Sequence, residues 1–196
     1  MGFLDAIRGR KAPAKPHLDA LFALPSAAIT LDVDLGLTPT GVGSVCFRGP
    51  EGRAFSDLKT QVRELLDADG GPRVEANADE FGFDWLTVRT EPADLAGAVT
   101  DIHAVNTSLV QAGFGPQLLC SLFPFTDQGG NTVSLVYLYK RGTFYPFAPQ
   151  VNTQDKSRNN VLELQIRDKL TGELPVELDM TRWFALWDAP GVTSSQ

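Results

Sequence analysis

The sequence predicts an α+β fold, a single domain in which helices flank a twisted, largely antiparallel five-stranded sheet. One observation is a pair of strand-like runs within residues 118–140, rich in aromatic and β-branched residues and joined by a turn that contains two glycines. A second is a run of apolar residues at helical spacing over 92–113. Taken with the shorter patterns described below, they predict the element order β-α-β-β-α-β-β, which is typical of an α+β domain.

The size and composition of the chain are those of a globular protein. It has 196 residues, of which 43% are hydrophobic and 21% are charged. The formal net charge of −7 argues against a general nucleic-acid-binding protein, which needs a basic stripe to displace counterions. No apolar run approaches the roughly 20 residues that a membrane span requires, and the first residues lack a signal-peptide pattern. We therefore expect a cytoplasmic protein, with a peripheral position at the inner face of the membrane left open.

The first residues form a short basic amphipathic segment. Phe3, Leu4 and Ile7 share one helical face, and the two prolines within residues 12–16 indicate a linker. Such a segment suits docking on the body of the domain or weak contact with a membrane surface. We expect three parts, which are an N-terminal segment with its linker over 1–16, a single domain over 17–190 and a flexible tail over 191–196.

The stretch 27–35 supports two readings. Its apolar residues alternate with polar ones, which predicts a half-buried strand. Ser26 and Gly36, however, stand where they could cap the two ends of a helix. Helix and strand are both left open here, whereas the run 41–48 predicts a strand.

Four elements are expected between residue 50 and the central hairpin. Residues 56–66 carry an apolar stripe at helical spacing. The runs 73–78 and 83–90 predict two strands that pair as a hairpin. Pro92 stands at a natural first helical position, so we expect a helix from there to Gly113.

The remaining elements surround the central hairpin, residues 118–140. Its second run has apolar side chains on both faces, so we expect it near the centre of the sheet. Residues 160–170 predict a helix, and Trp183, Phe184 and Trp187 should bring the end of the chain back onto the body. An alternative for residues 41–125 is a ferredoxin-like β-α-β-β-α-β unit with one further strand.

The sequence carries no recognisable catalytic, cofactor-binding or metal-binding pattern. His103 and Cys120 could be written as a hydrolytic or ligand-binding pair, but nothing in their spacing sets the distance between them. Cys46 and Cys120 each lie in a strand-like run, which predicts two reduced, buried thiols, and a disulfide is the alternative. We assign no catalytic residue and expect no enzyme activity, cofactor or metal.

A candidate protein-binding surface follows the central hairpin. Arg141, Phe144 and Tyr145 come directly after its second strand, and arginine and aromatic residues carry much of the energy of protein interfaces. The alternative is that the aromatic residues of this stretch close the edge of the core. A partner helix with an acidic face and an apolar stripe would match the surface.

Several strings of the sequence resemble the actinobacterial PspA-associated protein family PspAB. They are MGFLDAIRGR, LDALFALPSAAITL, PTGVGSVCFR, EGRAF, HAVN, AGFGPQLLCSL, LVYLYKRGTFYPFAP and RWF. The resemblance spans nearly the whole chain but includes no chemical motif. One departure is the run LDVDL at 31–35, where the family resemblance leads us to expect a more helix-prone stretch.

The resemblance implies a role beyond what the residues themselves indicate. It implies association with a PspA-like coiled-coil protein of membrane stress, and it implies no catalytic residues. We expect a non-enzymatic adaptor or chaperone-like regulator of the envelope stress response that acts by protein binding, with a fold similar to those of YbjN and type III secretion chaperones. The alternative is a small-molecule-binding or hydrolytic domain that uses His103 and Cys120. No nucleic acid is expected as a partner, and membrane contact is expected to be indirect or weak at most.

Overall fold

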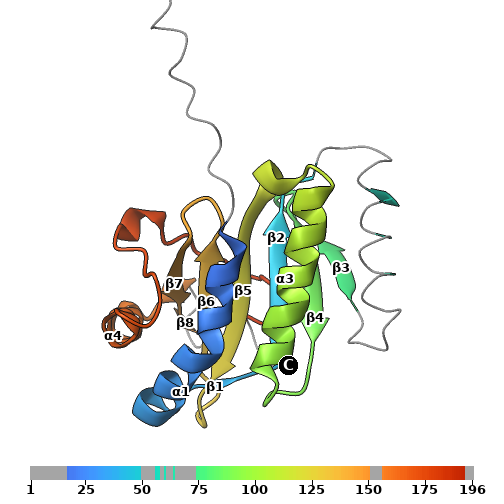
Figure 1. Cartoon of the computed structure of the whole chain (residues 1–196). Coiled ribbons are helices and arrows are strands. Elements are labelled where there is room, and N and C mark those ends of the chain that lie inside the picture. The colour runs from blue at the N-terminus through green and yellow to red at the C-terminus, as the bar shows by residue number, and fades with distance from the viewer. Residues whose placement is uncertain are drawn as a thin grey trace, which may run out of the picture.

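A seven-stranded antiparallel sheet organises the computed structural model, which describes residues 17–49, 74–150 and 156–192 and the positions 56, 57, 60 and 64. The strands are β1 (Thr38–Pro39), β2 (Val42–Phe47), β3 (Glu75–Ala78), β4 (Asp84–Arg89), β5 (Leu118–Thr126), β6 (Thr132–Leu138) and β7 (Thr143–Phe147). They lie in the order β3-β4-β2-β5-β6-β7, and β1 also pairs with β5 (Figure 1). A separate two-stranded sheet joins β8 (Pro149–Gln150) to β9 (Ser157–Arg158). The α+β fold is therefore confirmed.

The hairpin of β5 and β6 lies in the interior of this sheet, as predicted. β5 pairs with β2 on one side and with β6 on the other. Asp127 closes the turn between β5 and β6, because its Oδ1 accepts the amide N–H groups of Gly129 at 2.8 Å and Asn131 at 2.9 Å. These bonds, with one from the Asn131 side chain as the largest cause, hold the pKa of Asp127 below its ordinary value. The turn thus sets the register of the two central strands.

Helices cover one face of the sheet. The 3₁₀ helix η1 (Leu18–Ala23) continues into α1 (Leu24–Leu35), and both lie with α3 (Leu95–Gln111) in front of the strands (Figure 1). α4 (Asn160–Leu170) contributes to the same core. Buried members of this core include Leu21, Leu24, Val45, Phe47, Val88, Ile102, Val105, Leu109, Phe123, Leu135, Ile166 and Leu170. Alternate residues of each strand point to this side, as the two-residue period of a strand requires.

The C-terminal segment covers the other face. Its Trp183, Ala189 and Val192 are buried against the strands. The strand residues on this face are Cys46, Trp85, Cys120, Leu122, Val136, Tyr145 and Phe147. Trp187 packs edge-on against Phe147, with ring centroids 5.0 Å apart. The predicted return of the chain is confirmed for Trp183 and Trp187, whereas Phe184 is 61% exposed.

The open question at 27–35 is resolved as a helix. Leu31 is 1% exposed while Val33 is 78% exposed, although a strand would place both on one face. Gly36 ends α1 in the left-handed conformation, with φ of 64°, and its N–H bonds Asp32 O at 2.9 Å. Ala23 rather than Ser26 occupies the N-cap position. The alternation seen in the sequence is not a strand period, because Ile29 and Val33, two of its apolar residues, lie exposed on the surface of the helix.

α3 begins later than predicted. Asp94 caps it by accepting the N–H of Gly97 at 2.9 Å, so the helix starts at Leu95 and not at Pro92. Its end at Gln111, two residues before Gly113, agrees with the prediction. A proline fixes φ but gives no side-chain cap, and the aspartate three residues before Gly97 decides the boundary here.

The sheet has two strands more than the five predicted. β7 contains Pro146, which led us to read residues 143–147 as an exit from the hairpin. β7 ends the path of the sheet, where a proline costs little because its missing N–H is needed only by an outer neighbour. β1 is too short to show a period in the sequence.

The strands of 41–125 lie in the antiparallel order β3-β4-β2-β5. The ferredoxin-like alternative stays a prediction, because its first helix falls largely outside the described residues.

Three predictions fall wholly or partly outside the described residues. The N-terminal segment and linker, 1–16, lie outside them, as does most of the predicted helix 56–66, although its four described positions are helical. Of the predicted tail, 193–196 lie outside, while Val192 is fully buried, so the body of the domain reaches at least that residue. Among the helices described, none is long and apolar enough to cross a bilayer.

Candidate functional site

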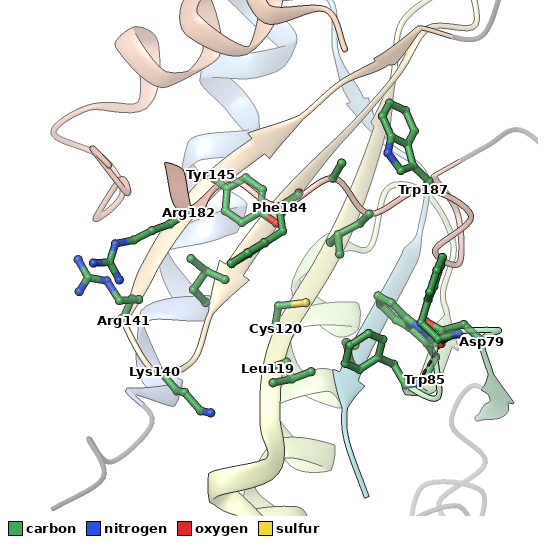
Figure 2. Close-up of a pocket in the computed structure, with 16 residues that line it drawn as sticks. Asp79, Trp85, Leu119, Cys120, Lys140, Arg141, Tyr145, Arg182, Phe184 and Trp187 are labelled. Atoms are coloured by element: carbon green, nitrogen blue, oxygen red, sulfur yellow. Dashed lines mark hydrogen bonds between the residues drawn. The ribbon is translucent and has the colours of Figure 1, made fainter. Parts of the chain in front are cut away.

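A pocket of about 640 Å³ lies on the face of the sheet that the helices leave uncovered (Figure 2). Cys46, Trp85 and Cys120 of three neighbouring strands line it from the sheet, and the C-terminal residues 184–187 line it from the other side. Its lining is mostly apolar. Volume and lining are those of sites that bind small molecules or apolar side chains.

Asp79 marks one end of the pocket. Its Oδ1 accepts the amide N–H groups of Phe81 at 2.9 Å and Phe83 at 2.8 Å, and its Oδ2 accepts the indole Nε1–H of Trp85 at 3.0 Å. Both carboxylate oxygens are thereby bonded within the chain. Asp79 therefore shapes the turn between β3 and β4 and fixes the indole in the pocket wall.

Three basic residues mark the opposite end (Figure 2). Lys140 and Arg141 come from the turn between β6 and β7, and Arg182 comes from the 3₁₀ helix η3 (Met180–Arg182). Arg182 Nε lies 2.7 Å from Asp179 Oδ2. This bond and one from Thr181, the larger cause, lower the pKa of Asp179 to about 2. Within the part of the chain that the structure describes, no ion pair joins Lys140 to a carboxylate.

Glu177 is a buried carboxylate, 3% exposed, behind this basic end. It accepts hydrogen bonds from Arg141 Nε at 2.9 Å, Thr143 Oγ1 at 3.1 Å and the Asp179 N–H at 3.1 Å. Burial by itself would raise the pKa of Glu177, but these bonds outweigh it and the pKa is lowered. The pKa of Arg141 is raised in turn by its bond to Glu177. The pair is ionised in the folded protein at neutral pH.

The segment that carries Glu177 is fastened to the edge strand β7 along its length. Phe144 donates its N–H to Pro175 O at 2.8 Å, and Glu177 donates its N–H to Phe144 O at 2.7 Å. Tyr145 OH donates to Phe184 O at 3.0 Å. Backbone and side-chain bonds together hold residues 175–184 in one position beside the pocket.

The structure separates the three predicted binding residues. The side chain of Arg141 is 44% exposed, whereas Phe144 and Tyr145 are each 1% exposed. Phe144 packs on Tyr137 in the core beneath the helices, with centroids 4.7 Å apart. Tyr145 points to the other face and stacks on Trp183 at 6.0 Å. Arg141 and Tyr145 both line the pocket, and the burial of Phe144 and Tyr145 matches the core-edge alternative.

His103 and Cys120 do not come together. His103 lies on α3, where its Nε2 is 3.3 Å from Asp19 Oδ1 and its ring is 4.8 Å from that of Phe22. Cys120 points to the opposite face of the sheet, into the pocket. The sheet stands between them, so the geometry does not form the dyad that the sequence left open. In the described part of the chain, no three His, Cys, Asp or Glu side chains form a group that could hold a metal ion.

The two cysteines are direct neighbours across β2 and β5. Both are buried and free, and a hydrogen bond between the thiols, together with burial, raises the pKa of Cys46. A thiol with a raised pKa has little thiolate and is a weak nucleophile. The predicted burial of both thiols is confirmed, and their reduced state stays a prediction that thiol labelling can test. Their pairing across β2 and β5 was not foreseen.

Sequence reasoning missed Asp79, Glu177 and Arg182 as parts of this site. They are remote in sequence from the hairpin that supplies Lys140 and Arg141. The signal that existed was the aromatic cluster at 183–187, which indicated that the chain returns to the body. That cluster did not indicate which face of the sheet the C-terminal segment covers. It also did not indicate that this segment brings the carboxylate of Glu177 to the pocket.

Comparison with known proteins identifies the family. The family model of PspA associated protein B matches residues 1–191, which is nearly the whole chain. No curated protein and no solved structure gives a significant match, so the expected likeness to YbjN and to type III secretion chaperones stays a prediction. A match of this extent confirms the resemblance carried by the quoted strings. The chain therefore belongs to the PspA associated protein B family.

Proposed function

We propose that this protein is a non-enzymatic adaptor or chaperone-like regulator that binds a PspA-type coiled-coil protein in the envelope stress response. The name of the family supports the choice of partner. The proposed contact is the surface beside the pocket, which we call the cationic edge. It consists of Lys140, Arg141, Leu178, Met180, Arg182 and Phe184.

The observation that supports this surface is its mixture of exposed apolar and basic side chains. Leu178 is 74% exposed, Met180 is 45% exposed and Phe184 is 61% exposed. The three apolar residues lie within seven positions of the chain and alternate with Arg182 and Asp179. Exposed apolar side chains gathered in this way mark interaction surfaces. A helix with an apolar stripe flanked by carboxylates is the complementary partner.

The cationic edge is held in place before any partner arrives. The bonds that fasten residues 175–184 to β7 restrict the backbone, so little ordering entropy is lost on binding. Arg141 and Arg182 each bond their own carboxylate through Nε, and a guanidinium carries five N–H donors. Donors therefore remain for a carboxylate of the partner, and Lys140 adds a further positive charge.

This role needs no catalytic residue and no cofactor. We propose that the adaptor works in the cytoplasm or peripherally at the inner face of the membrane, because the proposed partner belongs to the membrane stress response. Its own contact with the membrane is then indirect or weak.

The experiment is a binding titration of the purified full chain against a purified PspA-type coiled-coil protein. Met180→Ser and Lys140→Glu should each weaken binding by about five- to thirtyfold, the effect of about 1–2 kcal/mol that a contributing interface residue has. Val161→Ser is the matched control, because Val161 is 68% exposed on α4, away from the cationic edge. Thermal melting of each variant shows whether the fold is kept.

Two results would contradict the proposal. One is equal binding by the wild type, Met180→Ser and Lys140→Glu, with all three folded. The other is a loss of binding in Val161→Ser as large as in Met180→Ser, which would move the interface to another surface.

A further inference from the structure

We infer that the interior of the sheet-face pocket is a binding site for a single-chain anionic amphiphile, of the class of long-chain carboxylates. The pocket adjoins the proposed protein contact and shares its basic residues and Phe184, but its interior lies outside that contact. Leu178 and Met180 belong to the cationic edge but do not line the pocket, while Cys46, Trp85 and Cys120 line the pocket and are covered by the C-terminal segment. A substitution at Met180, which belongs only to the cationic edge, and one at Leu119, which belongs only to the pocket, therefore distinguish the two, whereas Lys140 belongs to both.

The floor and walls of the pocket suit an aliphatic tail. Cys46 and Cys120 present two free thiols, which are only weak hydrogen-bonding groups, and the hydroxyl of Tyr145 donates a hydrogen bond to Phe184 O. The indole N–H of Trp85 is bonded to Asp79. The tyrosine hydroxyl and the indole N–H are thus already paired within the chain, so a tail can cover them without leaving a donor unpaired. The volume of about 640 Å³ lies within the range of ligand sites.

The pocket has basic residues at one end and an acidic residue at the other. Lys140, Arg141 and Arg182 lie at one end, Asp79 lies at the other, and Cys120 lies between them (Figure 2). Asp79 is the only carboxylate that lines the pocket among the described residues, and its oxygens accept three hydrogen bonds. A ligand with one anionic head and one apolar tail matches this polarity, with its head at the basic end.

Lys140 is the residue that should determine the specificity of the pocket for an anionic head group. The side chains of Arg141 and Arg182 each have a carboxylate partner, whereas no ion pair in the described residues engages the ammonium of Lys140. Its compact charge can meet the ligand carboxylate without breaking an existing pair.

The test compares three probes on the full chain, dodecanoate, dodecanol and acetate, by titration calorimetry and by the fluorescence of the pocket tryptophans. Dodecanoate should bind one molecule per chain, with dodecanol roughly tenfold weaker and acetate not detectable, since both head and tail contribute. Lys140→Ala should weaken the binding of dodecanoate by about three- to tenfold and leave the affinity for dodecanol unchanged. Lys169→Ala, which removes the same charge from α4, is the control and should change neither.

A substitution that fills the pocket completes the test. Ala185 lines the pocket and is exposed, so Ala185→Trp can place an indole in it at little cost to folding, and Leu119→Trp is a second such variant. Both should abolish dodecanoate binding while the protein still melts cooperatively. Undiminished binding in two folded variants would overturn the inference, as would equal affinity of the wild type for dodecanoate and dodecanol.

A third result would reassign the pocket to the partner protein. If dodecanoate does not bind and Ala185→Trp abolishes binding of the PspA-type protein, the pocket receives an apolar side chain of that protein. Loss of dodecanoate binding in Ala185→Trp with partner binding intact supports the amphiphile. Failure of the adaptor proposal, seen with Met180→Ser, leaves the dodecanoate result unaffected.

Discussion

Arg141 Nε donates a hydrogen bond of 2.9 Å to the carboxylate of Glu177, a side chain of which only 4% is exposed. The two residues are 36 positions apart, and their contact joins the turn after β6 to the segment that covers the open face of the sheet. The same contact holds the cationic edge beside the pocket. Arg141 therefore has a structural role as well as a candidate binding role, and its substitution must be interpreted with that in mind.

Arg141→Ala should lower the free energy of unfolding, because the buried carboxylate of Glu177 loses a charged hydrogen-bond donor, although solvent screening at the exposed guanidinium reduces the effect. Glu177 keeps its bonds from Thr143 and the Asp179 amide, which limits the loss. Urea unfolding measures the change. Arg182→Ala is the control, because Arg182 and Asp179 are both about half exposed and their pair should contribute less to stability than a pair with a buried carboxylate. Equal losses in the two variants would show that the burial of Glu177 has no energetic consequence.

The lowered pKa of Glu177 predicts a specific dependence of stability on pH. The folded-state pKa lies below the ordinary value of 4.5, so the unfolded state binds more protons as the pH falls below that value. The stabilisation is fully present above pH 4.5 and is lost as the pH falls through the folded pKa. On acidification below pH 4.5 the wild type should therefore lose more unfolding free energy than Glu177→Gln, which has no carboxylate to protonate at this position. A difference that stays constant from neutral pH to pH 3 would contradict the lowered pKa.

Cys46 and Cys120 should react slowly with a thiol reagent in the native protein. Each is at most 5% exposed, and burial and the bond between the thiols raise the pKa of Cys46. Native labelling at pH 8 should be at least about a hundredfold slower than labelling in denaturant, where both thiols should react completely. Rapid labelling of Cys120 in the folded protein would show instead that the floor of the pocket opens readily to solvent.

Gly41 and Gly82 form a matched pair for testing close backbone approach. Both have positive φ, 76° and 78°. A Cβ on Gly41 would lie 2.3 Å from Thr90 O, whereas nothing lies within 4 Å of one on Gly82. Gly82→Ala should cost about 1 kcal/mol from backbone strain, and Gly41→Ala at least about 2 kcal/mol more, because the strands β2 and β4 must separate locally. Thermal unfolding measures both, and similar melting temperatures would refute the contact.

Local patterns predicted the elements whose own residues decide them. The spacing of apolar residues predicted α3 and α4, and the turn chemistry around Asp127 predicted the central hairpin. The same reasoning failed at β7, because a proline is tolerated there only through the position of the strand at the end of the sheet path. It left residues 27–35 undecided, because a mixed apolar and polar pattern over nine residues suits either period until the neighbouring elements select one face.

The candidate site was predictable only in part. Arg141 and Tyr145 were selected for their residue types, and both lie at the pocket. Phe144 was selected for the same reason and is buried beneath the helices, since consecutive strand residues point to opposite faces of the sheet. Both aromatic residues are 1% exposed, because each face of the sheet is covered there by segments that lie elsewhere in the chain.

The sequence by itself determined an α+β domain, its central hairpin, its principal helices and its place in the PspA associated protein B family. These follow from periodicity, turn residues and family-like strings, all of which are local. Only the tertiary structure decided that the C-terminal segment crosses the uncovered face of the sheet and brings Glu177 and Arg182 to Arg141. The physical reason is that a pocket forms where residues distant in the chain are packed together. The pattern of any single stretch of sequence does not determine which distant residues it will contact.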